Sequence, residues 1–152
     1  MVQTSAEARE QLLASLAEAT NDIGGALASL GAAYEQLDET SADELEERLF
    51  RPVQLAYGRA RRTYAEFARR HGLPSREFEP PSPGLPSIGA KGFIDNALVA
   101  VGRADNALVT LQDSLLPVEV GDPQLRASLA ELRELVGGLA QRARDLVRTL
   151  GR

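Results

Sequence analysis

The chain contains no cysteine and no tryptophan, and its only histidine is His71. The absence of cysteine excludes disulfides and thiolate-bound metals, and one histidine is too few for a zinc site built from cysteine and histidine. Helical di-iron proteins need Glu-x-x-His pairs, but the residue three positions before His71 is Ala68. We therefore expect no metal and no cofactor.

Motifs for catalysis are also missing. No glycine-rich phosphate loop follows a strand, and no serine lies in a recognisable nucleophile turn. His71 stands next to Gly72 at an expected helix end, where the helix dipole favours a cation, so we interpret it as a capping residue. The acidic residues at 43–47 fall in a first helical turn, where such residues are expected in any case. We therefore expect no enzymatic activity.

Long apolar runs and a basic surface are absent as well. No apolar run approaches the roughly 18 residues of a membrane span. The first residues show no basic segment followed by an apolar one, so we expect no signal peptide, no membrane span and a cytoplasmic location. The formal net charge of -5 argues against nucleic acid as a partner. In the arginine-rich run at 59–70, Tyr64 and Phe67 fall on an apolar stripe, unlike aromatic residues that stack on bases.

What the chain does contain is apolar residues spaced three and four apart in four long stretches, as in amphipathic helices. No stretch alternates as a β-strand does, and a length of 152 residues suits one domain. We predict an all-α fold, an antiparallel four-helix bundle formed by a single domain over residues 1–152. Its helices are expected over about 5–37, 42–71, 88–116 and 123–150.

Local signals set these boundaries. Thr4 and Ser41 each begin a capping box, which predicts an N-cap at both positions. Gly72 is placed to follow a helix end, since glycine favours the left-handed conformation found there. Asp122 followed by Pro123 predicts the start of the fourth helix.

Prolines interrupt the pattern at three places. Pro52 lies inside the second helix and removes the hydrogen bond to the carbonyl of Arg48, so we predict a kink or break there. Pro117 is expected to end the third helix. Residues 72–87 hold most of the prolines and form a stiff loop. At ~3.1 Å per residue in polyproline II, this loop is long enough either to cross the whole bundle or to fold back over one end of it.

The third helix contains the sequence DNALV twice, beginning at Asp95 and at Asp105. A shift of ten residues turns the second copy by about 80° around the helix. Asp95 then faces water, whereas Asp105 lies at the boundary of the apolar stripe. The repeat is therefore not a doubled site, because its two copies lie in different environments.

Asp105 and Gln112 lie seven residues apart on the same boundary, so we expect both to be half-buried. An unpaired buried carboxylate is costly, which leaves two interpretations open. Either these groups form a contact that fixes the register between helices, or they are polar anchors of a small-molecule cavity that also contains Tyr34, Tyr57 and Tyr64.

Glycine occurs near the middle of each predicted helix, although each one costs about 1 kcal/mol in a helix interior. Leu55 and Gly58 are expected to point outward on the second helix, and Val99 and Gly102 on the third. A surface of small and apolar residues permits close approach by another chain. We therefore predict an interface at these four residues.

Together these features favour a non-enzymatic protein-interaction or self-associating module, whose partner is another protein or a second copy of the chain. The alternative is a carrier or sensor that binds a small apolar ligand within the bundle. A cavity lined by the three tyrosines would favour the ligand, whereas a filled core would favour interaction.

Overall fold

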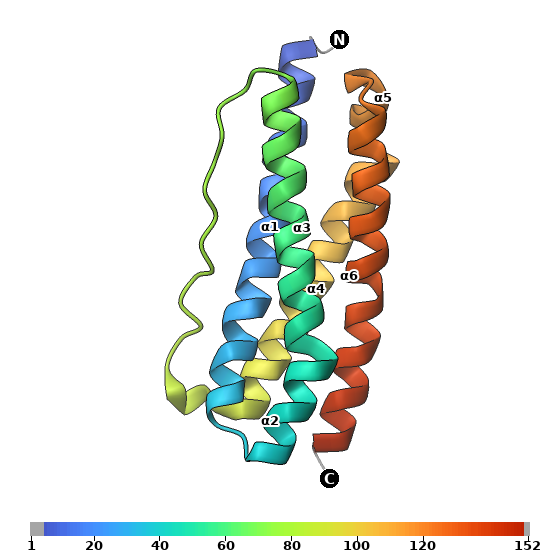
Figure 1. Cartoon of the computed structure of the whole chain (residues 1–152). Coiled ribbons are helices and arrows are strands. Elements are labelled where there is room, and N and C mark those ends of the chain that lie inside the picture. The colour runs from blue at the N-terminus through green and yellow to red at the C-terminus, as the bar shows by residue number, and fades with distance from the viewer. Residues whose placement is uncertain (1–4, 151–152) are drawn as a thin grey trace.

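The computed structural model describes residues 5–150, and within this range the chain is helical and contains no β-strand. Thr4, the first predicted N-cap, lies outside the described residues. Among the helices of residues 5–150, none has both the length and the apolarity that crossing a membrane requires. Most of the described chain lies in four long helices (Figure 1), namely α1 (Ser5–Glu35), α3 (Arg51–Arg70), α4 (Gly89–Asp113) and α6 (Pro123–Leu150).

Short helical elements connect the long ones. α2 (Glu39–Leu45) and the π-helical turn η1 (Glu46–Phe50) lead directly into α3, so these three elements form one continuous but irregular helix. A 3-10 turn, η2 (Pro86–Ile88), precedes α4, and α5 (Leu116–Val120) lies between α4 and α6. The helix predicted at 42–71 thus corresponds to three consecutive elements.

The four long helices lie side by side, and each packs against two others. α1 packs against α3 and α4, and α6 packs against the same two helices, so α1 and α6 lie on one diagonal and α3 and α4 on the other. In Figure 1, α1 and α6 run from top to bottom, whereas α3 and α4 run from bottom to top. Each long helix is therefore antiparallel to both of its packing partners, an arrangement compatible with the predicted antiparallel bundle.

The proline-rich segment at residues 72–85, which we call the strap, runs along the outside of the helices from the end of α3 to the start of α4 (Figure 1). It crosses the length of the molecule, which is the first of the two predicted alternatives. Phe78 anchors it, because this buried ring packs edge-on against Tyr64 with 5.2 Å between the ring centroids. Pro81 lies beside Gly25 of α1, so the strap contacts both α1 and α3.

The predicted apolar stripes form the core. The apolar residues of α6 that are spaced alternately four and three apart, from Leu125 through Val136 to Leu146, form a seam that is buried, and the apolar stripe of α3 is buried as well. Two residues continue the apolar spacing of α4 and α1 but are exposed, since Leu115 is 70% exposed and Tyr34 is 40% exposed. Leu115 is exposed because α4 ends at Asp113, before the stripe is complete. Tyr34 lies in the last turn of α1, beside the connection to α2, where less of the chain covers it.

Two helix ends follow their sequence signals. Gly72 adopts a φ of 66°, and the amide of Leu73 donates to the carbonyl of Ala68 at 2.8 Å, which completes a Schellman end for α3. Asp122 caps α6, because its Oδ1 accepts a hydrogen bond from the amide of Leu125 at 3.0 Å.

Two other ends differ from the prediction. The N-cap before α2 is Asp38 rather than Ser41, because the Asp38 carboxylate accepts a hydrogen bond from the amide of Ser41 at 2.8 Å. The third long helix, α4, ends at Asp113, three residues before the predicted end at 116, so Pro117 does not directly follow it. Pro117 occupies the first turn of α5, where a missing amide hydrogen leaves no hydrogen bond unmade.

Pro52 interrupts the α-helical pattern, as predicted, but the chain accommodates it without ending the helix. The amide of Arg51 donates to the carbonyl of Glu46, five residues earlier, so the turn widens into η1. Pro52 itself lies in the first turn of α3. The widened turn packs against α6, and it thereby sets where the first residues of α3 stand relative to that helix.

Candidate functional site

The predicted polar residues of α4 lie along its contact with α6. Gln112 is half-buried, and its Oε1 accepts a hydrogen bond from Nη1 of Arg133 at 3.0 Å. Asp105 is also half-buried, and a Cβ atom placed on Gly137 of α6 would lie 3.8 Å from its Oδ1. Within residues 5–150, Asp105 forms no hydrogen bond and no ion pair. Gln112, not Asp105, therefore makes the polar link between these helices.

Replacing Asp105 by alanine is expected to raise the free energy of unfolding by about 0.5 kcal/mol, because alanine favours a helix interior and the carboxylate has no partner to lose. Urea unfolding of the variant and the wild type measures this difference. Asp95→Ala, on the exposed face of the same helix, is the matched control and should give the same gain. A loss of about 1 kcal/mol confined to Asp105→Ala would instead reveal a stabilising contact with α6.

The three tyrosines lie elsewhere. Tyr57 and Tyr64 are buried on α3, on the side that faces α1 and the strap, whereas Tyr34 stands in the last turn of α1. Tyr57 packs closely on Gly24 of α1, where an added Cβ atom would lie 3.0 Å from Cε1 of the ring. Tyr57 thus faces α1, whereas Asp105 lies beside α6, so these two residues point toward different helices.

The hydroxyl of Tyr57 is buried and has no hydrogen-bond partner within the described chain. Burial raises the pKa of this phenol, and the guanidinium of Arg61, whose Cζ lies 5.0 Å from the ring centroid, opposes the increase. The hydroxyl is therefore a neutral polar group in the interior without a partner. Such a group costs about 1–3 kcal/mol relative to one that is hydrogen-bonded.

The four residues of the predicted interface occupy two helices that are not neighbours. Leu55 is 55% exposed on α3, and Val99 is 54% exposed on α4. In the part of the chain that the structure describes, no atom lies within 4 Å of a Cβ placed on Gly58 or Gly102. Leu55 and Val99 therefore belong to two different faces of the molecule, and each face has to be considered by itself.

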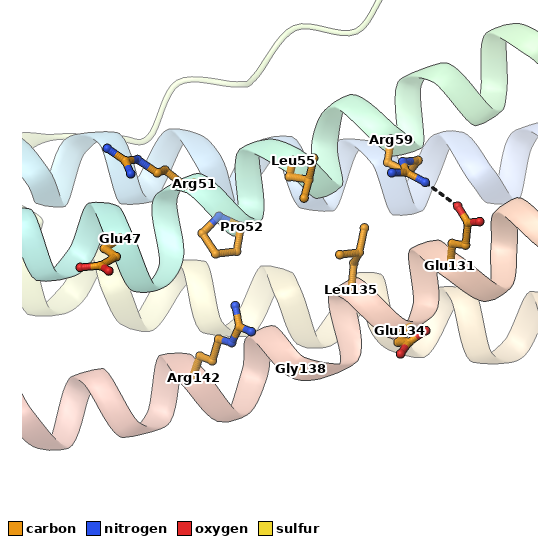
Figure 2. Close-up of a pocket in the computed structure, with 10 residues that line it drawn as sticks. All are labelled: Glu47, Arg51, Pro52, Leu55, Arg59, Glu131, Glu134, Leu135, Gly138 and Arg142. Atoms are coloured by element: carbon orange, nitrogen blue, oxygen red, sulfur yellow. Dashed lines mark hydrogen bonds and ion pairs between the residues drawn. The ribbon is translucent and has the colours of Figure 1, made fainter.

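Leu55 lines an open groove of about 820 Å³ between α3 and α6, which we call the α3–α6 groove. Figure 2 shows Leu55 and Leu135 pointing toward each other across the middle of this groove. Arg59 and Glu131 form an ion pair across one end, and Arg142 extends from α6 toward α3 near the other end. The groove therefore has an apolar centre between two charged ends.

Several charged groups of the groove have no internal partner. Within residues 5–150, Glu47, Glu134 and Arg142 form no ion pair. Arg51 lies 3.8 Å from the Glu46 carboxylate, which is too long for a strong hydrogen bond. These groups are held in place by their helices but are satisfied only by solvent, so they are free to pair with a partner molecule.

Sequence and structure differ in how much of this groove they reveal. Leu55 is a predicted interface residue, whereas Leu135 and the charged residues of α6 are not. The one sequence signal for Leu135 is that it is apolar but lies outside the seam, next to the seam residue Val136. The order in which the helices pack decides which helix faces Leu55, and the spacing of apolar residues does not contain that order.

A second polar cluster joins the end of α3 to the start of α6. The side chain of Asp122 is 6% exposed, and its Oδ2 lies 2.9 Å from both Nε2 of His71 and Nη2 of Arg70. Burial alone would raise the pKa of Asp122, but the hydrogen bonds from the Leu125 amide, His71 and Arg70 hold this pKa below its ordinary value. His71 is the C-cap residue that follows α3, and its imidazole binds Asp122 rather than the carbonyl groups of the helix.

The described residues contain no group of three or more side chains placed to hold a metal ion. No family of known proteins matches the chain, and no curated protein or solved structure is significantly similar to it. The function of the α3–α6 groove and of the Asp122 cluster therefore has to be inferred from their own geometry.

Proposed function

We propose that the chain is a non-enzymatic protein-interaction module, built as an antiparallel four-helix bundle with a proline-rich crossover, whose α3–α6 groove binds a helix of a partner chain. The observation that carries this proposal is the pair Leu55 and Leu135, which face each other across an open groove. Burying a leucine side chain is worth about 1.5–3 kcal/mol, so covering this pair supplies binding energy.

The charged ends of the groove suit the same function. An amphipathic helix laid into a groove places its apolar residues in the centre and its polar residues at the rim. Charges at a rim contribute to orientation and to the rate of association more than to affinity. Within residues 5–150, no ion-pair partner is present for Glu47, Glu134 or Arg142. A bound helix can therefore form ion pairs with them without breaking existing ones.

The alternative function, carriage of a small apolar ligand, has one observation in its favour, the buried Tyr57 hydroxyl without a partner. The surroundings of this hydroxyl favour the ligand less. Gly24 already packs against the ring of Tyr57, and the other predicted anchors, Asp105 and Gln112, lie along the contact between α4 and α6. A protein partner in the α3–α6 groove is therefore the function that the geometry supports better.

Site-specific crosslinking tests the proposal. A photoreactive benzoyl-phenylalanine placed at position 55 is expected to give discrete covalent adducts in cells, which a second change, Leu135→Asp, should abolish. The same residue at position 99 is the matched control, because Val99 has nearly the same exposure as Leu55 on a different face. Equal adducts from both positions, or none from position 55, would contradict a partner in the α3–α6 groove.

A further inference from the structure

The two walls of the α3–α6 groove carry complementary side chains. Because α3 and α6 are antiparallel, Glu47 of η1 and Arg142 of α6 both lie toward one end of the groove, Leu55 lies opposite Leu135 in the middle, and Arg59 lies opposite Glu131 at the other end. Each end of the groove thus has an acidic residue on one wall and a basic residue on the other, and in the middle an apolar residue faces an apolar one.

Two copies of the chain can bring these complementary walls together if they are related by a rotation of 180° about an axis parallel to the groove. Such a rotation keeps the direction of each helix but exchanges the two walls, so it places α6 of a second copy against α3 of the first. The reverse contact forms at the same time, because a two-fold interface is made of the same surface on both subunits. The four helices then alternate in direction around the interface, as the four long helices do within one chain.

We propose that the occupant of the α3–α6 groove is a second copy of this chain, related by a two-fold axis along the groove. This inference rests on the proposed function and names the partner. Each interface contains two contacts between Glu47 and Arg142 of different subunits and two between Leu55 and Leu135. Arg59 already forms an ion pair with Glu131 of its own chain, and in the dimer it also approaches Glu134 of the other subunit.

The charge distribution favours a second copy over an unrelated helix. Of the residues that line the groove, the α3 side contributes two arginines and one glutamate, and the α6 side contributes two glutamates and one arginine. The two sides therefore have net charges of opposite sign, so each side attracts the other side of a second copy. Gly138 adds room for this approach, because apart from the backbone around it no atom of the described chain lies within 4 Å of a Cβ placed there.

Charge reversal distinguishes this contact from other modes of association. The wild type is expected to sediment as a dimer at ~10 µM, whereas Glu47→Arg and Arg142→Glu should each weaken the dimer by about tenfold or more, because each change places like charges together twice. An equimolar mixture of the two variants should recover the dimer, since every Glu47–Arg142 contact is then again between opposite charges. The double variant E47R/R142E should recover it as well.

Both altered residues are exposed, so circular dichroism should show unchanged helicity, and Asp95→Arg on the outer face of α4 serves as the matched control that leaves the dimer intact. A monomeric wild type at ~100 µM, or a mixture that stays monomeric, overturns the proposal. Adducts from position 55 whose mass is not that of two copies would then keep the proposed function with a different partner, whereas the absence of adducts would remove both.

Discussion

Replacing Asp122 by alanine is expected to lower the free energy of unfolding by about 3 kcal/mol, a large share of the stability of a domain of this size. The substitution removes the N-cap of α6, which alone is worth about 1 kcal/mol. It also removes the carboxylate to which both Arg70 and His71 bind, so both side chains lose this partner. Hydrogen bonds to charged groups are worth about 1.5–3 kcal/mol, so the loss of these contacts exceeds the loss of the cap.

Asp38 provides the matched control for this prediction. It is the N-cap of α2 and accepts a hydrogen bond from the amide of Ser41, but it is exposed and, among residues 5–150, binds neither an arginine nor a histidine. Asp38→Ala should therefore cost only about 1 kcal/mol, the value of a cap by itself. Urea unfolding of both variants measures the difference, and equal losses would mean that Arg70 and His71 add nothing to the Asp122 cluster.

The Asp122 cluster also gives the folded protein a defined acid dependence. The folded-state pKa of Asp122 is held below the ordinary value of 3.8, so the stabilisation from its ionised form is fully present above that pH. It is lost as the pH falls through the folded-state pKa. Between about pH 5 and pH 2, the wild type is therefore expected to lose more stability than Asp122→Ala, which lacks this carboxylate.

The helices themselves are predictable from the sequence because each one carries its own apolar stripe. The seam of α6 and the stripe of α3 are buried as their spacing indicates, and the signals at Gly72 and Asp122 act within a few residues of where they stand. The N-cap of α2 is less predictable. Asp38, Thr40 and Ser41 are all capping residue types within four positions, and local sequence alone does not decide among them.

Contacts between distant segments account for what the sequence does not reveal. The length of the strap permits two paths, and the chosen one depends on Phe78 meeting Tyr64 and Pro81 meeting Gly25. The α3–α6 groove has the same origin. The helical wheel places Leu55 outward, but only the packing order of the helices brings α6 beside it. Charged residues on two helices can form many pairs, and periodicity does not select one of them.

The doubled DNALV sequence of α4 allows a second large effect to be tested with its own internal control. Leu108→Ala is expected to lower the free energy of unfolding by about 3 kcal/mol, because Leu108 is fully buried and its removal leaves a cavity in the core. Leu98 occupies the same place in the first copy but is only half-buried. Leu98→Ala should therefore cost about 1 kcal/mol, since the solvent already reaches part of its surface.

The comparison of Leu98 with Leu108 separates the effect of burial from the effects of residue type and neighbouring sequence. Both leucines stand in the same helix with identical neighbours on either side, so helix propensity and local sequence cancel between them. Val99→Ala extends the series to the exposed side of the helix, where a change within about 0.5 kcal/mol is expected. Equal losses of stability at Leu98 and Leu108 would contradict this prediction. They would mean that both leucines face the core equally, although the two copies are turned by about 80° relative to each other around the helix.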